Sequence, residues 1–398
     1  MRFWFCLFCC AASLSVAQAE ESAVAKTRAA SFNPDISLIL SGSYARLSND
    51  PDRYALPGFM LGPESGPGTR GLSLAESELV MSANVDDRFY GYFMASIAPD
   101  DSVSVEEAAV ETRGLAPGVT LRVGRFYSAI GYLNIQHPHA WDFADAPLAY
   151  RAFLATRYAD DGVQLRWVVP ADLFVEFGAE WFRGQNYPAG GAAKNGQGAA
   201  SAFAHIGGDV GDSHAWRGGL SFLRAQALGR QSGAIDTAPD AFSGDSRVAI
   251  ADVVWKWSPR GNATHTNFKI QAEYLWRNED GRFSADVNAI PGPAVSDAYR
   301  ATQSGWYAQT VYQFMPQWRA GLRYDRLRTH DSAAGLNAAL FDTLGHTPRR
   351  ASLMLDWSHS EFSRVRLQLS RDRSRPDADS QVFVQYIMSL GAHGAHTF

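Results

Sequence analysis

The segment that decides the fold is Gln381-Val-Phe-Val-Gln-Tyr-Ile-Met-Ser-Leu390, near the end of the 398-residue chain. Apolar side chains occupy every second position of it: Val382, Val384, Tyr386, Met388 and Leu390. This is the period of a β-strand with one apolar face. The last residue is Phe398, and an alternating final strand followed by a terminal aromatic residue is typical of a bacterial outer-membrane β-barrel. The segment therefore predicts a transmembrane barrel.

The first residues have the pattern of a secretory signal. An apolar stretch, 3–16, follows Arg2, and Ala17-Gln-Ala19 is a small-x-small cleavage site. We expect residues 1–19 to be a signal peptide, 20–34 a short periplasmic segment and 35–398 the barrel. All three cysteines lie in the expected signal: Cys6, Cys9 and Cys10. The exported chain would then have no thiol for a disulfide or a cysteine metal site.

The composition excludes several classes of protein. Charged residues make up 19% of the chain, and no run of ~20 apolar residues follows its start. In hydrocarbon, a closed barrel is then the structure that satisfies every backbone polar group. Acidic residues outnumber basic ones by 41 to 36, so a nucleic acid is not expected as a partner. The basic residues are nearly all arginine, whose planar charge suits a pore that handles anions.

Alternating segments recur along the whole exported chain and predict an all-β, antiparallel barrel of about sixteen strands. The predicted strands are 36–47, 72–85, 88–98, 103–113, 119–127, 161–169, 172–183, 200–210, 215–226, 247–257, 267–277, 305–314, 317–328, 350–358, 362–372 and 381–391. Every other joint is a tight turn, and the joints between are mostly long. An even number of strands places the short turns in the periplasm and the long loops outside.

Inward positions of these strands carry charge, and the two signs fall on different strands. The expected inward carboxylates are Glu76, Glu78, Glu107, Glu111, Glu176 and Glu180. The expected inward arginines are Arg122, Arg166, Arg217, Arg319, Arg323, Arg364 and Arg366. Facing rows of opposite sign would set up a transverse field across a water-filled pore and act as a selectivity filter. Alternatively, these charges pair with one another and stiffen the wall.

The third outer loop, 128–157, is rich in apolar and aromatic residues, which is unusual for an exposed loop. We expect it to fold into the barrel and narrow the pore. The same region carries two histidines, His137 and His139, with Asp142 close by. On an extended backbone the two imidazoles project from one side, so these three residues could hold zinc. His393 and His396 form a second candidate pair.

The stretch from Val123 to Gly162 carries a family resemblance. It starts with Gly-Arg-Phe-Tyr, has Ile-Gly-Tyr at its centre and ends with Pro-Leu-Ala-Tyr-Arg-Ala-Phe-Leu before Asp160-Asp-Gly162. It resembles the inward-folded loop of the phosphate-selective porin superfamily and, more closely, a proteobacterial group often labelled zinc-regulated outer-membrane proteins. The ending Ser389 to Phe398 also resembles that group. The resemblance implies a porin-type barrel in the outer membrane; the zinc in the label fits regulation of the gene as well as a bound metal.

The sequence therefore predicts a channel in the bacterial outer membrane that passes small hydrophilic or anionic solutes by diffusion. A zinc-responsive metal uptake or binding protein is the alternative, and a structural or adhesive barrel is a third. Enzymatic activity is not expected, because Ser128 and His137 lack a nucleophile elbow and a third orienting group. Outer-membrane lipid and small solutes or ions are the expected partners, and a homotrimer is compatible with a porin of this size. No cofactor is expected apart from zinc under the alternative.

Overall fold

A computed structural model describes residues 34–98, 100–191, 193–232, 240–286 and 294–391, which form seventeen strands of one antiparallel sheet. The predicted signal peptide and the pair His393 and His396 lie outside the described residues. The strands are β1 (Asp35–Leu47), β2 (Gly71–Leu74), β3 (Ser77–Asn84), β4 (Phe89–Ile97), β5 (Val103–Thr112), β6 (Val119–Tyr127), β7 (Ala159–Val168), β8 (Phe174–Phe182), β9 (Ala199–Val210), β10 (His214–Ser232), β11 (Asp240–Trp257), β12 (Asn267–Ala285), β13 (Val295–Met315), β14 (Trp318–Ala333), β15 (Arg349–Ser360), β16 (Ser363–Arg373) and β17 (Asp379–Gly391).

Short helices lie in the connections between strands. They are η1 (Pro51–Arg53), η2 (Pro138–Ala140), α2 (Leu148–Leu154), α3 (Ala193–Gly196), η3 (Pro259–Gly261) and η4 (Gly335–Phe341). No helix in the described part of the chain has both the length and the apolar character that a membrane span requires.

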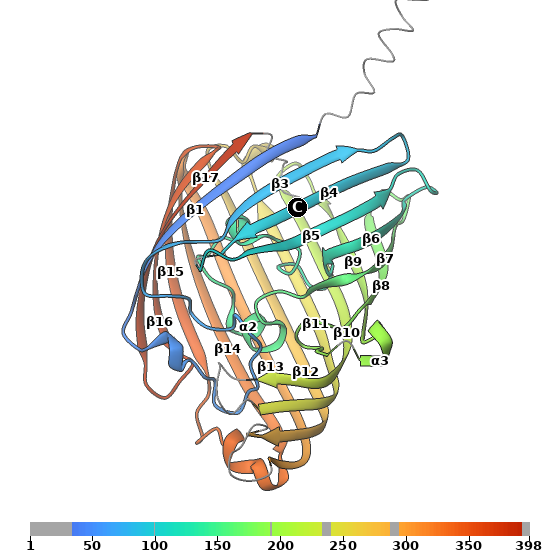
Figure 1. Ribbon diagram of the computed structural model, residues 1–398. Helices are drawn as coiled ribbons and strands as arrows, with labels where there is room; N and C mark the ends of the chain where they lie inside the picture. Colours follow the sequence, from blue (N-terminus) through green and yellow to red (C-terminus); the bar gives the residue numbers. More distant parts are fainter. Residues whose placement is uncertain (1–33, 99, 192, 233–239, 287–293, 392–398) are drawn as a thin grey trace, which may run out of the picture.

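The sheet closes on itself between its first and last strands. β1 pairs with β17 from Ser37 opposite Gly391 to Leu47 opposite Gln381, and the two lie side by side in Figure 1. On its other edge β1 pairs with both β2 and β3, which are two halves of one strand interrupted at Ala75 and Glu76. The seventeen segments therefore form a closed barrel of sixteen strand positions, and the predicted fold class is confirmed.

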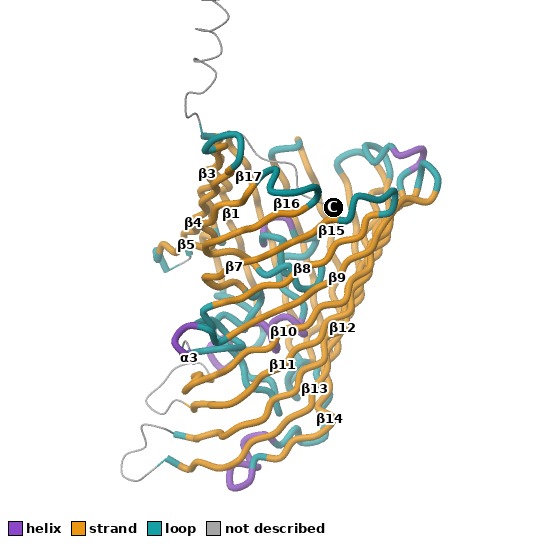
Figure 2. The backbone as a smooth tube through the Cα atoms, turned by 90° about the vertical axis from the view of Figure 1, so that its right-hand side faces the viewer, coloured by secondary structure: helices purple, strands orange, loops and turns teal. Residues whose placement is uncertain are grey.

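All sixteen predicted strands are present, but those of one wall are longer than predicted. The strands β10 to β13 run for 18 to 21 residues, and this wall extends well beyond the rest of the barrel (Figure 2). We expected the regions 227–246, 278–304 and 329–349 to be loops. In the structure the neighbouring strands continue into both ends of the first two regions and into the start of the third. Alternation with an apolar outward row reveals only the lipid-facing part of a strand, because the outward row becomes polar where the strand continues into water. The large apolar residues of the extensions, such as Phe242, Phe283 and Tyr299, are instead buried in a separate cluster.

The two faces of the strands have the chemistry that a barrel in lipid needs. In β7, Val163, Leu165 and Trp167 are 38–47% exposed on the outside, whereas the intervening Gln164 is 1% exposed. Large exposed apolar side chains recur in this way on the outward faces of most strands. These rows face the hydrocarbon, and the intervening residues face the interior.

The interior is packed with two outer loops. The connection 128–158 carries α2, all of whose residues are buried and which packs against β12, β13 and β14, within the ring of strands (Figure 1). The first outer loop also turns inward, which we did not predict, and its Leu56 and Phe59 join the same apolar cluster as Phe153. Wall residues such as Leu275 complete the cluster. Two apolar loops thus form a core inside the barrel.

A charge on the lipid-facing surface should destabilise the barrel. Leu353 is 50% exposed on β15, between Leu355 and Ala351 on the outward face. Leu353→Arg is expected to lower the free energy of unfolding by about 2–4 kcal/mol, because a guanidinium near the middle of the hydrocarbon loses its hydration. Equilibrium unfolding in lipid vesicles measures the change, with Leu353→Ala as the control. An equal loss for both variants would contradict the assignment of this face to lipid.

Candidate functional site

The candidate site is the third outer loop, residues 128–157, called here the constriction loop, together with the charged wall around it. Both ends of the loop are fixed to each other. Asn134 donates from its side-chain nitrogen to the carbonyl oxygens of Ser128 (2.7 Å) and Tyr158 (2.8 Å), and its own oxygen accepts from the Tyr158 amide. Glu180 of β8 accepts from the Ser128 hydroxyl and from the Ala129 amide. The prediction that this loop folds inward is confirmed.

The middle of the constriction loop is held by one carboxyl group of the wall. Glu273 of β12, 2% exposed, accepts from the backbone amides of Tyr132 (3.1 Å) and Leu133 (3.0 Å). It also accepts from the hydroxyls of Tyr150 (2.7 Å) and Tyr307 (2.5 Å). Four donors converge on this carboxyl group, three of them from the loop, so Glu273 is the main polar anchor of the loop. Glu273 was not among the candidate site residues that the sequence suggested.

The two aspartates of the loop contact arginines of the wall. Asp145 accepts from the wall residues Arg323 (2.5 Å) and Arg350 (2.6 Å) and also from Arg151 (2.9 Å) of the loop's own helix α2. Burial favours a raised pKa for Asp145, but Arg350, Arg323 and Arg151 outweigh it and hold the pKa of this carboxyl below its usual range.

Asp142 is also buried, and its carboxylate pairs with Lys269 and with Arg319 (3.4 Å). Burial opposes ionisation of Asp142, yet Lys269 and Arg319 keep its pKa below its usual range. The anionic part of the constriction loop therefore faces the cationic wall.

The two imidazoles of the loop and Arg157 face the opposite, acidic wall. His137 lies 3.1 Å from Glu107 and His139 lies 3.0 Å from Glu78, measured from ring nitrogen to carboxylate oxygen. The two imidazoles stack with their centroids 5.7 Å apart. Arg157, at the end of the loop, lies 3.3 Å from Glu76. The two sides of the loop thus differ: its aspartates face the arginines of one wall, and its imidazoles and Arg157 face the glutamates of the other.

One acidic residue of this wall was missed in the sequence. Glu106 accepts from the Tyr127 hydroxyl (2.5 Å) and lies 3.5 Å from Arg157. A β-bulge explains the omission: Met94 pairs with Glu107 and the next residue, Ala95, pairs with Val105, so Glu106 is an extra residue. Strict alternation assigns Glu106 to the outside, but the bulge lets two successive glutamates reach the interior.

The remaining predicted residues also have partners on the wall. Arg122 pairs with Glu111, Arg166 lies 3.6 Å from Glu176, and Arg217 lies 3.8 Å from Asp252. Arg364 and Arg366 both lie beside Asp356 of β15 (3.9 and 2.8 Å). The interpretation in which inward charges pair with one another therefore describes most of these groups.

The predicted zinc ligands do not assemble. The carboxylate of Asp142 pairs with Lys269 and Arg319, whereas His137 and His139 face the glutamates of β3 and β5. Within the described ranges no three His, Cys, Asp or Glu side chains are arranged to hold a metal ion. The set of His137, His139 and Asp142 is thus wrong as a chelate, because charge pairing draws the aspartate toward the arginine wall and away from the histidines.

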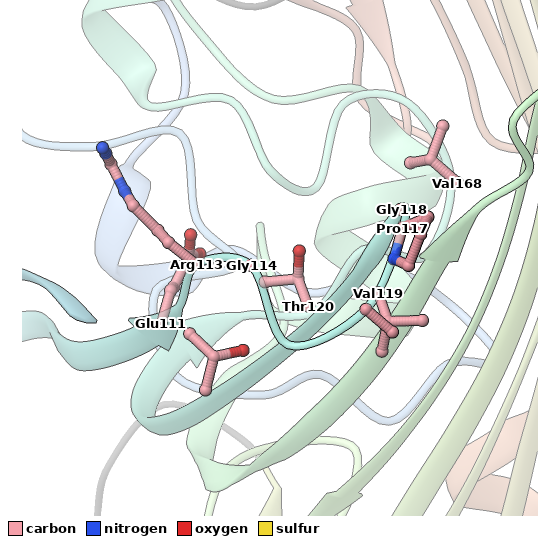
Figure 3. Close-up of a pocket in the computed structure, with 10 residues that line it drawn as sticks. Glu111, Arg113, Gly114, Pro117, Gly118, Val119, Thr120 and Val168 are labelled. Atoms are coloured by element: carbon pink, nitrogen blue, oxygen red, sulfur yellow. The ribbon is translucent and has the colours of Figure 1, made fainter. Parts of the chain in front are cut away.

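A separate surface pocket lies at the periplasmic turn that joins β5 to β6 (Figure 3). Gly118, Val119 and Val168 line it together with the inward-facing Glu111. Glu111 is its only residue in common with the predicted site, and no residue of the constriction loop lines it. The pocket is therefore not part of the candidate site.

Removing the Glu273 anchor should loosen the constriction loop. Glu273→Ala leaves the buried amides of Tyr132 and Leu133 without an acceptor, so the free energy of unfolding should fall by about 3 kcal/mol or more. Amide hydrogen exchange at these two residues should accelerate. Glu111→Ala, which removes a wall carboxylate that pairs with Arg122, is the control. Unchanged exchange in the Glu273 variant would contradict the anchoring role.

Acid should break the aspartate contacts of the loop only at a pH below the usual range of aspartate. The pKa values of Asp142 and Asp145 are lowered in the folded protein, so their contribution is present above the unfolded pKa of about 4 and is lost as the pH falls through the lower folded values. The contribution of these two aspartates to protection of the loop amides should therefore be constant from pH 7 to about 4. In Asp145→Asn the protection should be reduced at neutral pH. Equal protection of the loop amides in the wild type and in Asp145→Asn at pH 7 would refute the pairing.

The comparisons with known proteins agree with this architecture. A protein of Aquifex aeolicus (strain VF5) is 30% identical over 393 residues, which covers 92% of this chain and 80% of that protein. Among solved structures, a loop-deletion mutant of the Vibrio cholerae outer membrane protein OmpT has 12% identity and a TM-score of 0.55, covering 90% of this chain and 99% of that one. An anion-selective porin from Comamonas acidovorans has 9% identity and a TM-score of 0.54, covering 90% and 100%. These structures share the fold.

A protein-family model that matches the sequence of this chain identifies its family. The model for phosphate-selective porin O and P matches residues 79–333, which include the constriction loop and part of each charged wall. With the closed barrel, this match places the protein in the bacterial outer membrane as a channel for small solutes, and supports neither the zinc-uptake nor the adhesive alternative. The closer likeness to the zinc-regulated group stays a prediction. The chain belongs to the phosphate-selective porin O and P family.

Proposed function

We propose that this channel passes small hydrophilic solutes by passive diffusion and prefers anions. The observation that carries the proposal is an excess of cationic side chains near the periplasmic ends of the strands, below the constriction loop. In the part of the chain that the structure describes, four inward cations there lie beside two carboxylates, those of Asp142 and Asp356. The cations are Lys269, Arg319, Arg364 and Arg366.

Several of these cations keep contact with water. The side chains of Lys269, Arg319 and Arg364 are 19%, 23% and 17% exposed, whereas Arg323 and Arg366 are 1% exposed beneath the loop. The predicted anion contacts therefore divide into two groups. Arg323 and Arg366 are buried and only hold the loop. Lys269, Arg319 and Arg364 also contact the loop, at Asp142 and at the His139 carbonyl, but each keeps an exposed part that can act on the solute.

The electrostatic reason is the imbalance of charge in a narrow, protein-walled passage. Guanidinium groups bind carboxylate and phosphate oxygens through paired hydrogen bonds, and rings of arginine and lysine are the usual lining of anion pores. The acidic wall lies across the passage but is partly neutralised by Arg157 at Glu76 and Glu106. The Comamonas acidovorans neighbour is named an anion-selective porin; the same preference is proposed here on the charges of this chain.

A channel role is proposed over an enzymatic one. The hydroxyl of Ser128 donates to Glu180, and the Nε2 of His137 lies against Glu107, so the two residues considered for a hydrolytic pair are engaged with separate glutamates. We also propose a homotrimer, since OmpT of Vibrio cholerae, a neighbour with a TM-score of 0.53, is described in a trimer form. Chemical cross-linking in native membranes tests the trimer.

Neutralising the exposed cations should weaken the anion preference. In a combined variant with Lys269→Gln, Arg319→Gln and Arg364→Gln, the anion-to-cation permeability ratio should fall toward one, because the excess positive charge is removed. Reversal potentials across a planar bilayer in a salt gradient measure the ratio. Arg224→Gln with Arg247→Gln on the outer surface is the control. An unchanged reversal potential in the triple variant would refute the proposal.

A further inference from the structure

The outward faces of β14, β15 and β16 change from apolar to cationic at the same level. Along β15 the outward side chains are Trp357, Leu355, Leu353, Ala351 and then Arg349, all of them exposed. The neighbouring strands change in the same way toward their outer ends. Five exposed arginines result, called here the arginine patch: Arg326, Arg328, Arg349, Arg371 and Arg373.

The strand register brings three of these arginines into one row. Arg326 of β14 pairs with Arg349 of β15, and Arg349 pairs in turn with Arg373 of β16. Like charges directly opposite each other on adjacent strands destabilise a sheet. Three in a row therefore need a counter-charge, or they lower the stability of this wall.

The protein itself does not supply the counter-charge. Some exposed arginines elsewhere on the outer surface have acidic partners: Arg224 and Arg247 share Asp245, and Arg300 lies 2.8 Å from Asp280. No arginine of the patch forms an ion pair with any residue that the structure describes. Arg371 alone donates a side-chain hydrogen bond, to Ser380. The patch is thus an unneutralised positive surface that faces away from the lumen.

The depth of the patch points to its ligand. Arg349 is eight residues from Trp357 along β15, which is about 26 Å at ~3.3 Å per residue and about 20 Å across the membrane for a strand tilted by ~40°. The apolar band of an outer-membrane barrel is ~25 Å tall, with aromatic residues at its interfaces. The patch therefore lies at the outer edge of this band, at the level of lipid headgroups and on the side of the long loops.

We propose that the arginine patch binds the phosphorylated headgroup of a lipid in the outer leaflet. A phosphate oxygen pair accepts two parallel hydrogen bonds from one guanidinium, and one phosphate can bridge adjacent guanidinium groups of the row. The acyl chains would then lie along the apolar rows beneath, over Leu353 and Leu369. The ligand is a lipid and not the transported solute, because the patch and these leucines share the lipid-facing surface.

Lipid retention tests the proposal. The full-length protein is folded in detergent with a bis-phosphorylated lipid A-type glycolipid, and the bound lipid is counted by native mass spectrometry. The test variant combines Arg326→Gln, Arg349→Gln and Arg373→Gln, and the control combines Arg224→Gln with Arg247→Gln. The wild type and the control should retain the glycolipid, and the test variant should lose at least tenfold in affinity.

Two further arms identify the ligand chemistry. The same glycolipid without its phosphates should bind the wild type as weakly as the test variant binds the phosphorylated form. Inorganic phosphate at equal concentration should not displace the bound lipid. Since removing like charges relieves repulsion, the test variant should fold at least as well as the wild type, which heat-modifiability on gels verifies.

The result that overturns the proposal is equal retention by the wild type and the test variant. Equal binding of the dephosphorylated lipid would overturn it too, as would displacement by inorganic phosphate. A change in oligomeric state with lipid retention unchanged would assign the patch to a contact between copies of the chain and would equally refute it. Channel selectivity should not change in the test variant, so this test is separate from that of anion preference.

Discussion

The structure depends on one constraint, which is that every backbone N–H and C=O in the hydrocarbon needs a partner within the protein. The pairing of β1 with β17 meets this constraint, because it removes the two free edges that the sheet would otherwise have. Closure also fixes which side of each strand faces lipid and which faces the lumen. The apolar rows outside and the charged rows inside are both consequences of it.

The enclosed interior creates a second problem, since sixteen strands surround more space than their own side chains fill. Two outer loops enter it and form an apolar core, and the constriction loop is positioned by charge as well as by packing. Asp145 faces Arg323 and Arg350, while Arg157 faces Glu76. Because the two sides of the loop that face opposite walls carry different charges, the loop fits the barrel in one orientation. The wall cations that stay partly exposed to water beside the loop, Lys269, Arg319 and Arg364, are the basis for the proposed anion preference.

Alternation along the chain was enough to predict the sixteen strands. The segment 200–210, whose Ala and Gly residues make the alternation faint, is also a strand, β9. The inward loop was also predictable, because a run such as Leu148–Leu154 is too apolar for an exposed position. The partner of each inward charge could not be predicted in the same way. Glu106 was missed because a β-bulge breaks the period of two, and Asp142 was grouped with His137 on sequence distance alone, although opposite walls of the barrel attract the two side chains.

The sequence by itself determined the barrel, its strand order, its lipid-facing rows and the sign of charge on the inward positions of regular strands, because these properties are local and follow from a period of two residues. Only the tertiary structure decided that the first loop also fills the lumen, that Glu273 anchors the constriction loop, and that Arg326, Arg349 and Arg373 form a row. These features join residues far apart in the chain. They depend on strand register and on how loops pack in an enclosed space, which no local pattern specifies.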